Sequence, residues 1–417
     1  MPEEITAAKR RWAMLGVSLT ATLSATVFVK GIAFLIPVLD HEHDISLAGA
    51  ALLSAMPGAG MLLTHIGWGY LLDRVGERRV LSAGLALTAC SAYGAAIVPP
   101  TILAQGMCLF VGGMSAASAY TASGPLVTGW FPPNQRGLAM GIRQTAPPLG
   151  VALAAFVLPE LGESSFSSAL IFCATLCGSA ALICAVTVRD SSRPELADIT
   201  HYDGVSPYRG TSVLWRIHLS SALLMVPQTV VFTFMLVWLI EAHDWSVPAA
   251  GALVSLSQLL GAIGRIVVGR WSDRLGSRTA PIRRIAAAAA LVLLSMAIMD
   301  QLRWPFAIGL MVAASVITVL DNGLAFTAIA EIAGRYWSGR AMATQNTTQT
   351  VAAAAGAPLF GEVIELAGYP LGFAICGVLP LLALPMVPMH TPLDQRVTPS
   401  SPSDSRSHRP DLDPQAA

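Results

Sequence analysis

The 417-residue chain is 54% hydrophobic and only 12% charged, with no formal net charge and a mean hydropathy of +0.61. A soluble globular protein carries charge on roughly a quarter of its residues, so this composition excludes a large water-soluble domain and predicts an integral membrane protein. The six cysteines all fall within apolar runs, where thiols act as small hydrophobic groups, and we expect neither a disulfide framework nor a metal site from them.

Apolar runs of about 20 residues, enough to cross a hydrocarbon layer of ~30 Å, follow one another along the chain. The first six lie near 13–39, 47–72, 80–98, 101–129, 138–159 and 166–187, and the second six near 213–240, 247–270, 284–301, 305–331, 341–364 and 367–389. We therefore predict an all-α integral membrane protein with twelve transmembrane helices in two pseudo-symmetric six-helix bundles. Its predicted parts are an N-terminal tail (1–12), the first bundle (13–187), a polar linker (188–212), the second bundle (213–390) and a Ser/Pro-rich disordered tail (391–417).

Basic residues alternate between the segments that connect these spans. The N-terminal segment carries Lys9, Arg10 and Arg11, the next segment carries none, and the alternation continues with Arg303 as its exception. Because cytoplasmic segments are enriched in Lys and Arg, both termini and the linker are predicted to be cytoplasmic. The predicted location is the cytoplasmic (inner) membrane of the cell.

The two halves resemble each other in sequence. GYLLDRVGERR at 69–79 recurs as GRWSDRLGSRT at 269–279, and RGLAMGIRQT at 136–145 recurs more weakly as GRAMATQNT at 339–347. Six spans repeated twice are typical of secondary transporters, whose binding site lies between the repeats. From the residues alone, the motif glycines permit close helix packing and tight turns. The motif aspartates are placed to accept hydrogen bonds from the amino terminus of a neighbouring helix.

The repeated G-x-x-x-D-R-x-G-x-R pattern resembles the signature of the major facilitator superfamily (MFS), and the resemblance covers residues 13–390. Within that superfamily the chain is most similar to prokaryotic cyanate, nitrate and monocarboxylate porters. The resemblance implies transport by alternating access and a conformational role for the motif at the inner gate. The residues concerned are Gly69, Asp73, Arg74, Gly76, Arg78, Gly269, Asp273, Arg274, Gly276 and Arg278. We expect Arg143, early in the fifth span, to act at the gate or at a helix end.

Four ionisable residues lie deep in the predicted spans, where each costs about 2.5–3.5 kcal/mol on insertion scales. Lys30 is the only charge between 13 and 39 and is predicted to line a central cavity, with a structural pairing as the alternative. Arg265 and His65 are related by the 200-residue repeat, which predicts that they grip one anion from both sides. Asp321 carries either the coupling proton or one half of a structural ion pair with Arg265.

Neutral polar residues complete the predicted substrate site. Gln228, Gln345 and Tyr120 are candidates to line the cavity, although such side chains also join membrane helices. The run HEHD at 41–44 has the residue types of a metal site, but we predict no metal there. Because neither lysine belongs to a phosphate-binding loop, and because no catalytic motif stands out, we predict neither an enzyme nor a cofactor.

The sign of the deep charges predicts the substrate. Lys30, Arg265 and protonated His65 outnumber Asp321, which favours a small organic anion, most simply a carboxylate, taken up with protons by a secondary transporter. The alternative is a drug or metabolite exporter, since TAPPLG at 145–150 partly matches the Gly/Pro-rich fifth helix of such proteins. The predicted partners are the substrate, protons and the lipid bilayer, without nucleic acid, and the protein is predicted to be a monomer.

Overall fold

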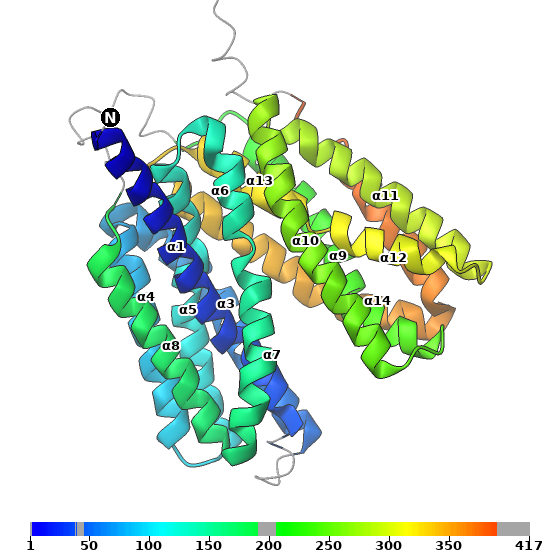
Figure 1. The fold of residues 1–417 in the computed structure, drawn as a ribbon, viewed down its shortest axis with the longest axis horizontal. Helices are drawn as coiled ribbons and strands as arrows, with labels where there is room; N and C mark the ends of the chain where they lie inside the picture. The colour runs from blue at the N-terminus through cyan, green and yellow to red at the C-terminus, as the bar shows by residue number, and fades with distance from the viewer. Residues whose placement is uncertain (1, 38, 40–45, 191–205, 390–417) are drawn as a thin grey trace, which may run out of the picture.

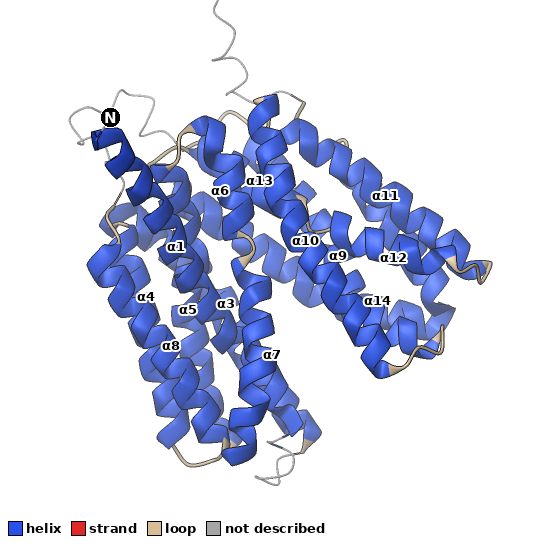
Figure 2. Ribbon diagram, in the orientation of Figure 1, coloured by secondary structure: helices blue, strands red, loops and turns tan. Residues whose placement is uncertain are grey.

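The computed structural model describes residues 2–37, 39, 46–190 and 206–389, and within them helices and turns make up the fold with no strand (Figure 2). The first half contains α1 (Pro2–Gly31), η1 (Ile32–Leu35), α3 (Leu47–Val75), α4 (Glu77–Ile97), α5 (Ile102–Trp130), η2 (Pro133–Gln135), α6 (Arg136–Arg143), α7 (Ala146–Ser164) and α8 (Phe166–Thr187). The second contains α9 (Val213–Glu241), α10 (Val247–Leu275), α11 (Thr279–Gln301), α12 (Phe306–Ile317), α13 (Asp321–Ala333) and α14 (Ser338–Ala383). Because α1 begins at Pro2, the predicted N-terminal tail continues the first span as a helix.

The number of membrane spans agrees with the sequence. Among the described residues, eleven helical segments are long and apolar enough to cross a membrane. One of them is α14, whose 46 residues are interrupted at Gly368 by a non-helical backbone with φ 81° and ψ 166°. The two parts of α14 correspond to the predicted eleventh and twelfth spans, which are joined by this one residue. The prediction of an all-α membrane protein is therefore confirmed.

Gly368 adopts a conformation that is essentially restricted to glycine. We expect Gly368→Ala to lower the free energy of unfolding by about 1–3 kcal/mol through backbone strain. An added Cβ would contact only Pro370 Cδ, at 3.7 Å, so steric crowding contributes little. Denaturant unfolding in detergent measures the effect. The control is Gly309→Ala in α12, where no atom lies within 4 Å of the added Cβ and a small gain is expected. Equal stability of the two variants would contradict the prediction.

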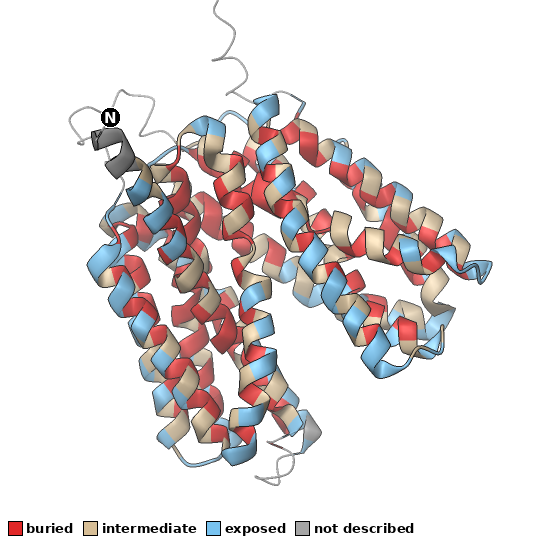
Figure 3. Ribbon diagram, in the orientation of Figure 1, coloured by how far each residue is buried: buried red, intermediate tan, exposed pale blue. Residues whose placement is uncertain are grey.

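Each half forms its own bundle with its own apolar core (Figure 1). Buried residues concentrate inside the two bundles, and exposed residues follow their outer faces (Figure 3). Many of the exposed side chains are large and apolar, including Phe156 at 79% and Leu103 at 76% exposure. Such surfaces are unfavourable in water and suit contact with lipid chains.

The bundles meet at one end of the molecule and diverge toward the other (Figure 1). We call the first the closed end; it carries the α3–α4 and α10–α11 turns at Gly76 and Gly276. Both glycines have positive φ, as the predicted tight turns require. The other end is called the far end. A shared apolar cluster joins the bundles near the closed end; its members are Leu15, Val127, Phe131, Ala139, Met140, Phe326, Ala330 and Met342.

Candidate functional site

Two pairs of glycines bring the bundles into backbone contact at the closed end. Gly69 of α3 lies against Gly339 of α14, and Gly269 of α10 lies against Gly137 beside the start of α6. A Cβ at any of these positions would overlap the backbone of the partner, so only glycine permits this approach. The sequence repeat is therefore matched by two equivalent contacts between the halves.

Each contact is closed by an aspartate that accepts from helix amino-terminal N–H groups. Asp273 accepts from the backbone N–H groups of Gly137 and Leu138, at 2.9 and 2.8 Å. These N–H groups belong to the first turn of α6, where they have no partner within the helix. A carboxylate at this position is also favoured by the helix dipole. The acceptor role predicted for Asp273 from its place in the motif agrees with these contacts.

Asp73 makes the equivalent contacts with the start of α14. Its carboxylate accepts from the backbone N–H groups of Gly339 and Arg340, at 2.8 and 3.1 Å. The Arg340 guanidinium adds an ion pair, with Nε 2.8 Å from Asp73 Oδ2. The closed end is thus held by two carboxylates that each cross from one bundle to the other.

The motif arginines make different contacts in the two halves. Arg278 pairs with Asp273 at 2.7 Å and with Glu331 at 3.1 Å, and Glu331 also pairs with Arg136 of the first bundle at 3.5 Å. Burial alone would lower the pKa of the Arg278 guanidinium, but the ion pairs with Glu331 and Asp273 raise it above its usual value. The second-half motif therefore forms a charged cluster that joins both bundles.

The first-half arginines make other contacts. Arg78 donates from Nε to the carbonyl oxygen of Ala185 at 2.7 Å, and its backbone N–H bonds Asp190, so it ties α4 to the end of α8 within one bundle. The Arg74 guanidinium lies 4.2 Å from the Tyr70 ring centroid. Arg274 is exposed at the closed end.

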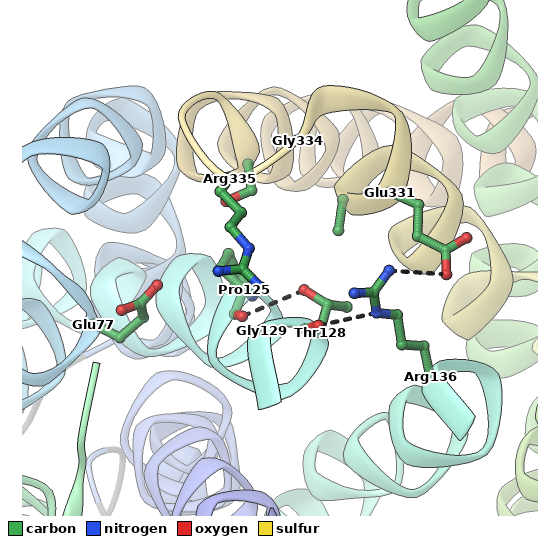
Figure 4. A pocket seen from close by; sticks show the side chains of 10 residues that line it. Glu77, Pro125, Thr128, Gly129, Arg136, Glu331, Gly334 and Arg335 are labelled. Carbon is green, nitrogen blue, oxygen red and sulfur yellow. Dashed lines mark hydrogen bonds and ion pairs between the residues drawn. The ribbon is translucent and has the colours of Figure 1, made fainter. Parts of the chain in front are cut away.

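A cavity of about 180 Å³ lies between α5 and the carboxyl end of α13 at the closed end (Figure 4). Arg136 and Arg335 line it from opposite bundles, and the Arg136–Glu331 ion pair is at its edge. Its walls belong to the same elements that hold the closed end together. The cavity is therefore part of the contact between the bundles at the closed end.

A second polar cluster lies deeper, at the break between α6 and α7. Arg143 ends α6 and is 2% exposed. Its Nε donates to Ser123 Oγ at 3.1 Å, its Nη2 to the Tyr120 carbonyl oxygen at 3.0 Å, and its Nη1 to Gln144 Oε1 at 2.7 Å. Ser123 Oγ also accepts from Thr22 of α1. The helix break thus directs Arg143 into the centre of the first bundle.

Arg265 reaches the same place from the second bundle. Its Nη1 donates to the Gln144 carbonyl oxygen at 3.1 Å, and its Nε donates to the Val319 carbonyl oxygen at 3.2 Å. Gln144 therefore accepts from both arginines, through its side chain from Arg143 and through its backbone from Arg265. The Nη2 group of Arg265 makes no hydrogen bond to any described residue. Two guanidinium groups from opposite bundles therefore meet at Gln144, and the Nη2 donors of Arg265 are not used by described residues.

Asp321 is the buried carboxylate beside this cluster. It begins α13, directly after the turn that interrupts the tenth span, and is 2% exposed. Its charge interacts with that of Arg265, but among the described residues it forms no ion pair within 4.0 Å. Of the two predicted roles, the structural ion pair is not formed in this conformation.

Lys30 is exposed, although Phe28, Val29 and Ile32 around it are buried. It lies eleven residues, or about three helical turns, beyond Leu19 and so on the same face of α1. Leu19 packs against the cluster between the bundles, so this face is directed toward the second bundle. Among the described residues Lys30 has no hydrogen bond or ion pair. Its ammonium is therefore presented toward the other half, where the bundles have diverged.

The predicted pairing of His65 with Arg265 does not occur in the structure. His65 is 1% exposed, and its Nδ1 lies 3.2 Å from Thr121 Oγ1 on α5. Its ring makes an edge contact with Tyr120, whose hydroxyl lies 2.7 Å from Thr26 Oγ1. His65 and Tyr120 therefore support the helix that carries Ser123. Arg143 takes the place opposite Arg265 that we predicted for His65.

The predicted amides belong to a hydrogen-bonded network in the second bundle. It runs in order through His218, Gln345, Ser221, Gln349, Asn322 and Gln228. Gln345 is fully buried, while Gln228 at the other end is partly exposed and accepts from Asn322 at 2.8 Å. In this conformation Gln228 is the member of the network best placed to meet a ligand.

Sequence reasoning missed Gln144 and Ser123, and it gave Arg143 a different role. The signal available for Gln144 was its place before Ala146-Pro147-Pro148, since residues before prolines tend to leave the helical conformation. The HEHD run at 41–44 lies outside the described residues. The described residues contain no group of three or more His, Cys, Asp or Glu side chains arranged to hold a metal ion.

Comparisons with known proteins point to a single family along most of the chain. A family model described as Major Facilitator Superfamily matches residues 17–357. An uncharacterized MFS-type transporter of Mycobacterium tuberculosis is 54% identical over 389 residues, which are 93% of this chain and 87% of that protein.

Two more distant proteins extend the comparison. A probable sulfoacetate transporter of Cupriavidus necator is 24% identical over 403 residues, covering 89% of this chain and 91% of that one. The crystal structure of a human organic anion transporter superposes with a TM-score of 0.73 at 19% identity, covering 91% of this chain and 99% of that one. The similarity to this crystal structure concerns the fold alone.

Proposed function

The chain belongs to the Major Facilitator Superfamily, and on this premise we propose that it is a secondary active transporter of a small organic anion, most simply a carboxylate. The observation that carries the proposal is the convergence of Arg143 and Arg265 on Gln144. The free donors of Arg265 are suited to a carboxylate, which guanidinium groups bind through two parallel hydrogen bonds. The name of the sulfoacetate transporter among its relatives supports an anionic substrate.

We place the closed end in the cytoplasm, because the basic connecting segments lie there. The structure then corresponds to an outward-facing state, with Lys30 toward the outside and both termini in the cytoplasm. An anion entering from outside meets Lys30 first and then the two arginines. Parting of the Asp73 and Asp273 contacts releases it into the cytoplasm. The protein acts as a monomer in the cytoplasmic membrane.

Asp321 is the residue that we propose to carry the coupling proton. It is a buried carboxylate without an ion pair within 4.0 Å among the described residues, so protonation breaks no salt bridge. Its charge is close enough to Arg265 to affect the anion site. Protonation of Asp321 removes a negative charge beside that site and so favours anion binding. Proton and anion would thus be taken up together.

Transport into proteoliposomes tests this proposal. We expect uptake of a labelled carboxylate to follow an inward proton gradient. The Asp321→Asn variant should lose this response while still exchanging carboxylate across the membrane at equal pH. The matched control is Asp244→Asn, at an exposed loop position with φ 55°, a conformation that asparagine tolerates. Uptake driven by the proton gradient in Asp321→Asn would refute the role of Asp321. If wild-type protein instead accumulates carboxylate only when the proton gradient is directed outward, or accumulates lipophilic cations, the exporter is favoured.

A further inference from the structure

The charges around Gln144 do not balance. Arg143, Arg265 and Lys30 are three cations, and among the described residues Asp321 is the carboxylate placed with them. His65 nearby is buried against Thr121 and counts as neutral. While Asp321 is ionised, the central region therefore holds two positive charges in excess, and it holds three once Asp321 carries the coupling proton proposed above. A single carboxylate would neutralise only one of them.

The excess charge matters because the site must close. When the bundles meet at the far end, water leaves this region, and each uncompensated ion then costs several kcal/mol. Lys30 is an exposed residue in the outward-facing state, so closure is the step that would bury it further. A substrate that carries two negative charges would neutralise two of the excess cations, where a monoanion neutralises one, and would so make closure with substrate less costly.

The positions of the cations specify the shape of such a substrate. Thr22 marks the level of Arg143, since both bond Ser123 Oγ. Lys30 lies eight residues further along α1, a rise of ~12 Å. A lysine side chain extends about 6 Å from its Cα. An ammonium directed back toward the arginines would thus be roughly 6 Å from their level, within reach of both ends of a short-chain molecule.

We infer that the substrate is a dianion with an acidic group at each end of a short chain, one end held between Arg143 and Arg265 and the other by Lys30. This inference rests on the proposed function, because it names the substrate class of the same site. Lys30 is then the residue that distinguishes dianions from monoanions, while the two arginines bind the acidic group that both classes share.

Isothermal titration of the purified full-length protein with matched acids tests the inference. The pairs are succinate with butyrate and glutarate with valerate, which have equal carbon numbers, at about pH 7.5 where carboxyl groups are ionised. We expect one dianion to bind per chain, at least tenfold more tightly than the matched monoanion. Dianion binding no tighter than monoanion binding, or two monoanions bound per chain at equal affinity, would overturn the inference.

Variants of Lys30 separate this inference from the proposed function. Lys30→Gln should bring the two Kd values of each pair together by weakening only the dianion, and Lys30→Arg should restore the preference. The control is Lys9→Gln, an exposed lysine on the same helix outside the bundle, which should leave both affinities unchanged. Equal weakening of both acids by Lys30→Gln would refute the dianion but leave the anion transporter intact. Absence of binding for every acid in wild-type protein would refute both.

Discussion

Anion binding is expected to weaken at least 100-fold in an Arg265→Gln variant. Arg265 is 8% exposed, and its guanidinium donates to Gln144 and Val319 and keeps its Nη2 group free of described partners. Truncating one partner of a buried, hydrogen-bonded charge pair costs about 2–5 kcal/mol. A loss of about 3 kcal/mol corresponds to roughly 100-fold in Kd. The measurement is the Kd of the carboxylate that binds wild-type protein best.

Two further variants show whether the loss belongs to the anion site. Arg265→Lys keeps the charge but not the two parallel donors, so we expect an intermediate loss. Arg270→Gln removes an exposed arginine five residues further along the same helix and should bind as wild type does. An Arg265→Gln variant with unchanged affinity would mean that the anion binds elsewhere, and the convergence at Gln144 would then be structural.

Asp273→Asn is expected to shift the equilibrium away from the closed-end conformation by about 100-fold. Asp273 accepts from two backbone N–H groups of the other bundle and pairs with Arg278. The asparagine amide has one acceptor oxygen and no charge, and a hydrogen bond to a charged group contributes about 1.5–3 kcal/mol. A loss of about 3 kcal/mol across the two bonds between the bundles changes an equilibrium roughly 100-fold. Hydrogen exchange of the peptide containing Gly137 and Leu138 measures the change, because Asp273 accepts from both of these N–H groups.

The same experiment reveals whether the halves part as rigid bodies. If they do, Asp273→Asn accelerates exchange at 339–340 as well, where Asp73 protects the N–H groups of α14. The reciprocal variant Asp73→Asn should then accelerate exchange at 137–138. Faster exchange confined to 137–138 would mean that the two contacts open independently. Unchanged exchange at 137–138 would contradict the gate role of Asp273.

The fold followed from sequence because membrane spans obey a simple rule. Every apolar run of about 20 residues became a span, and the eleventh and twelfth runs are the two parts of α14 on either side of Gly368. The glycine and aspartate contacts at the closed end also followed from sequence, since each of these residue types has a direct physical reason to lie there. Close approach needs glycine, and a helix amino terminus needs an acceptor. Lys30 was singled out for being the only charge in its span.

The centre of the site did not follow, because it depends on helix breaks. Arg143 was expected to act at the gate or at a helix end. It does end α6, and the turn at Gln144 and Thr145 directs its side chain toward α5. The helix break before Asp321 could not be predicted, because the preceding run VITVLD contains no glycine or proline. The backbone carbonyl of Gln144, which accepts from Arg265, is a group that every residue has. Its role comes from position and not from residue type.

The one-residue joint at Gly368 has a consequence for how the molecule moves. The first part of α14 runs from the gate contact at Gly339 to Gly368, about 45 Å at 1.5 Å per residue. A tilt of about 10° at the gate would displace its other end by roughly 8 Å over this length. A flexible loop at this position would allow the two parts of α14 to move separately. A connection of one residue, Gly368, is too short for that. The part of α14 after Gly368 must therefore move together with the part before it. A small movement at the Asp73 contact would thus produce a larger displacement at the opposite face of the membrane.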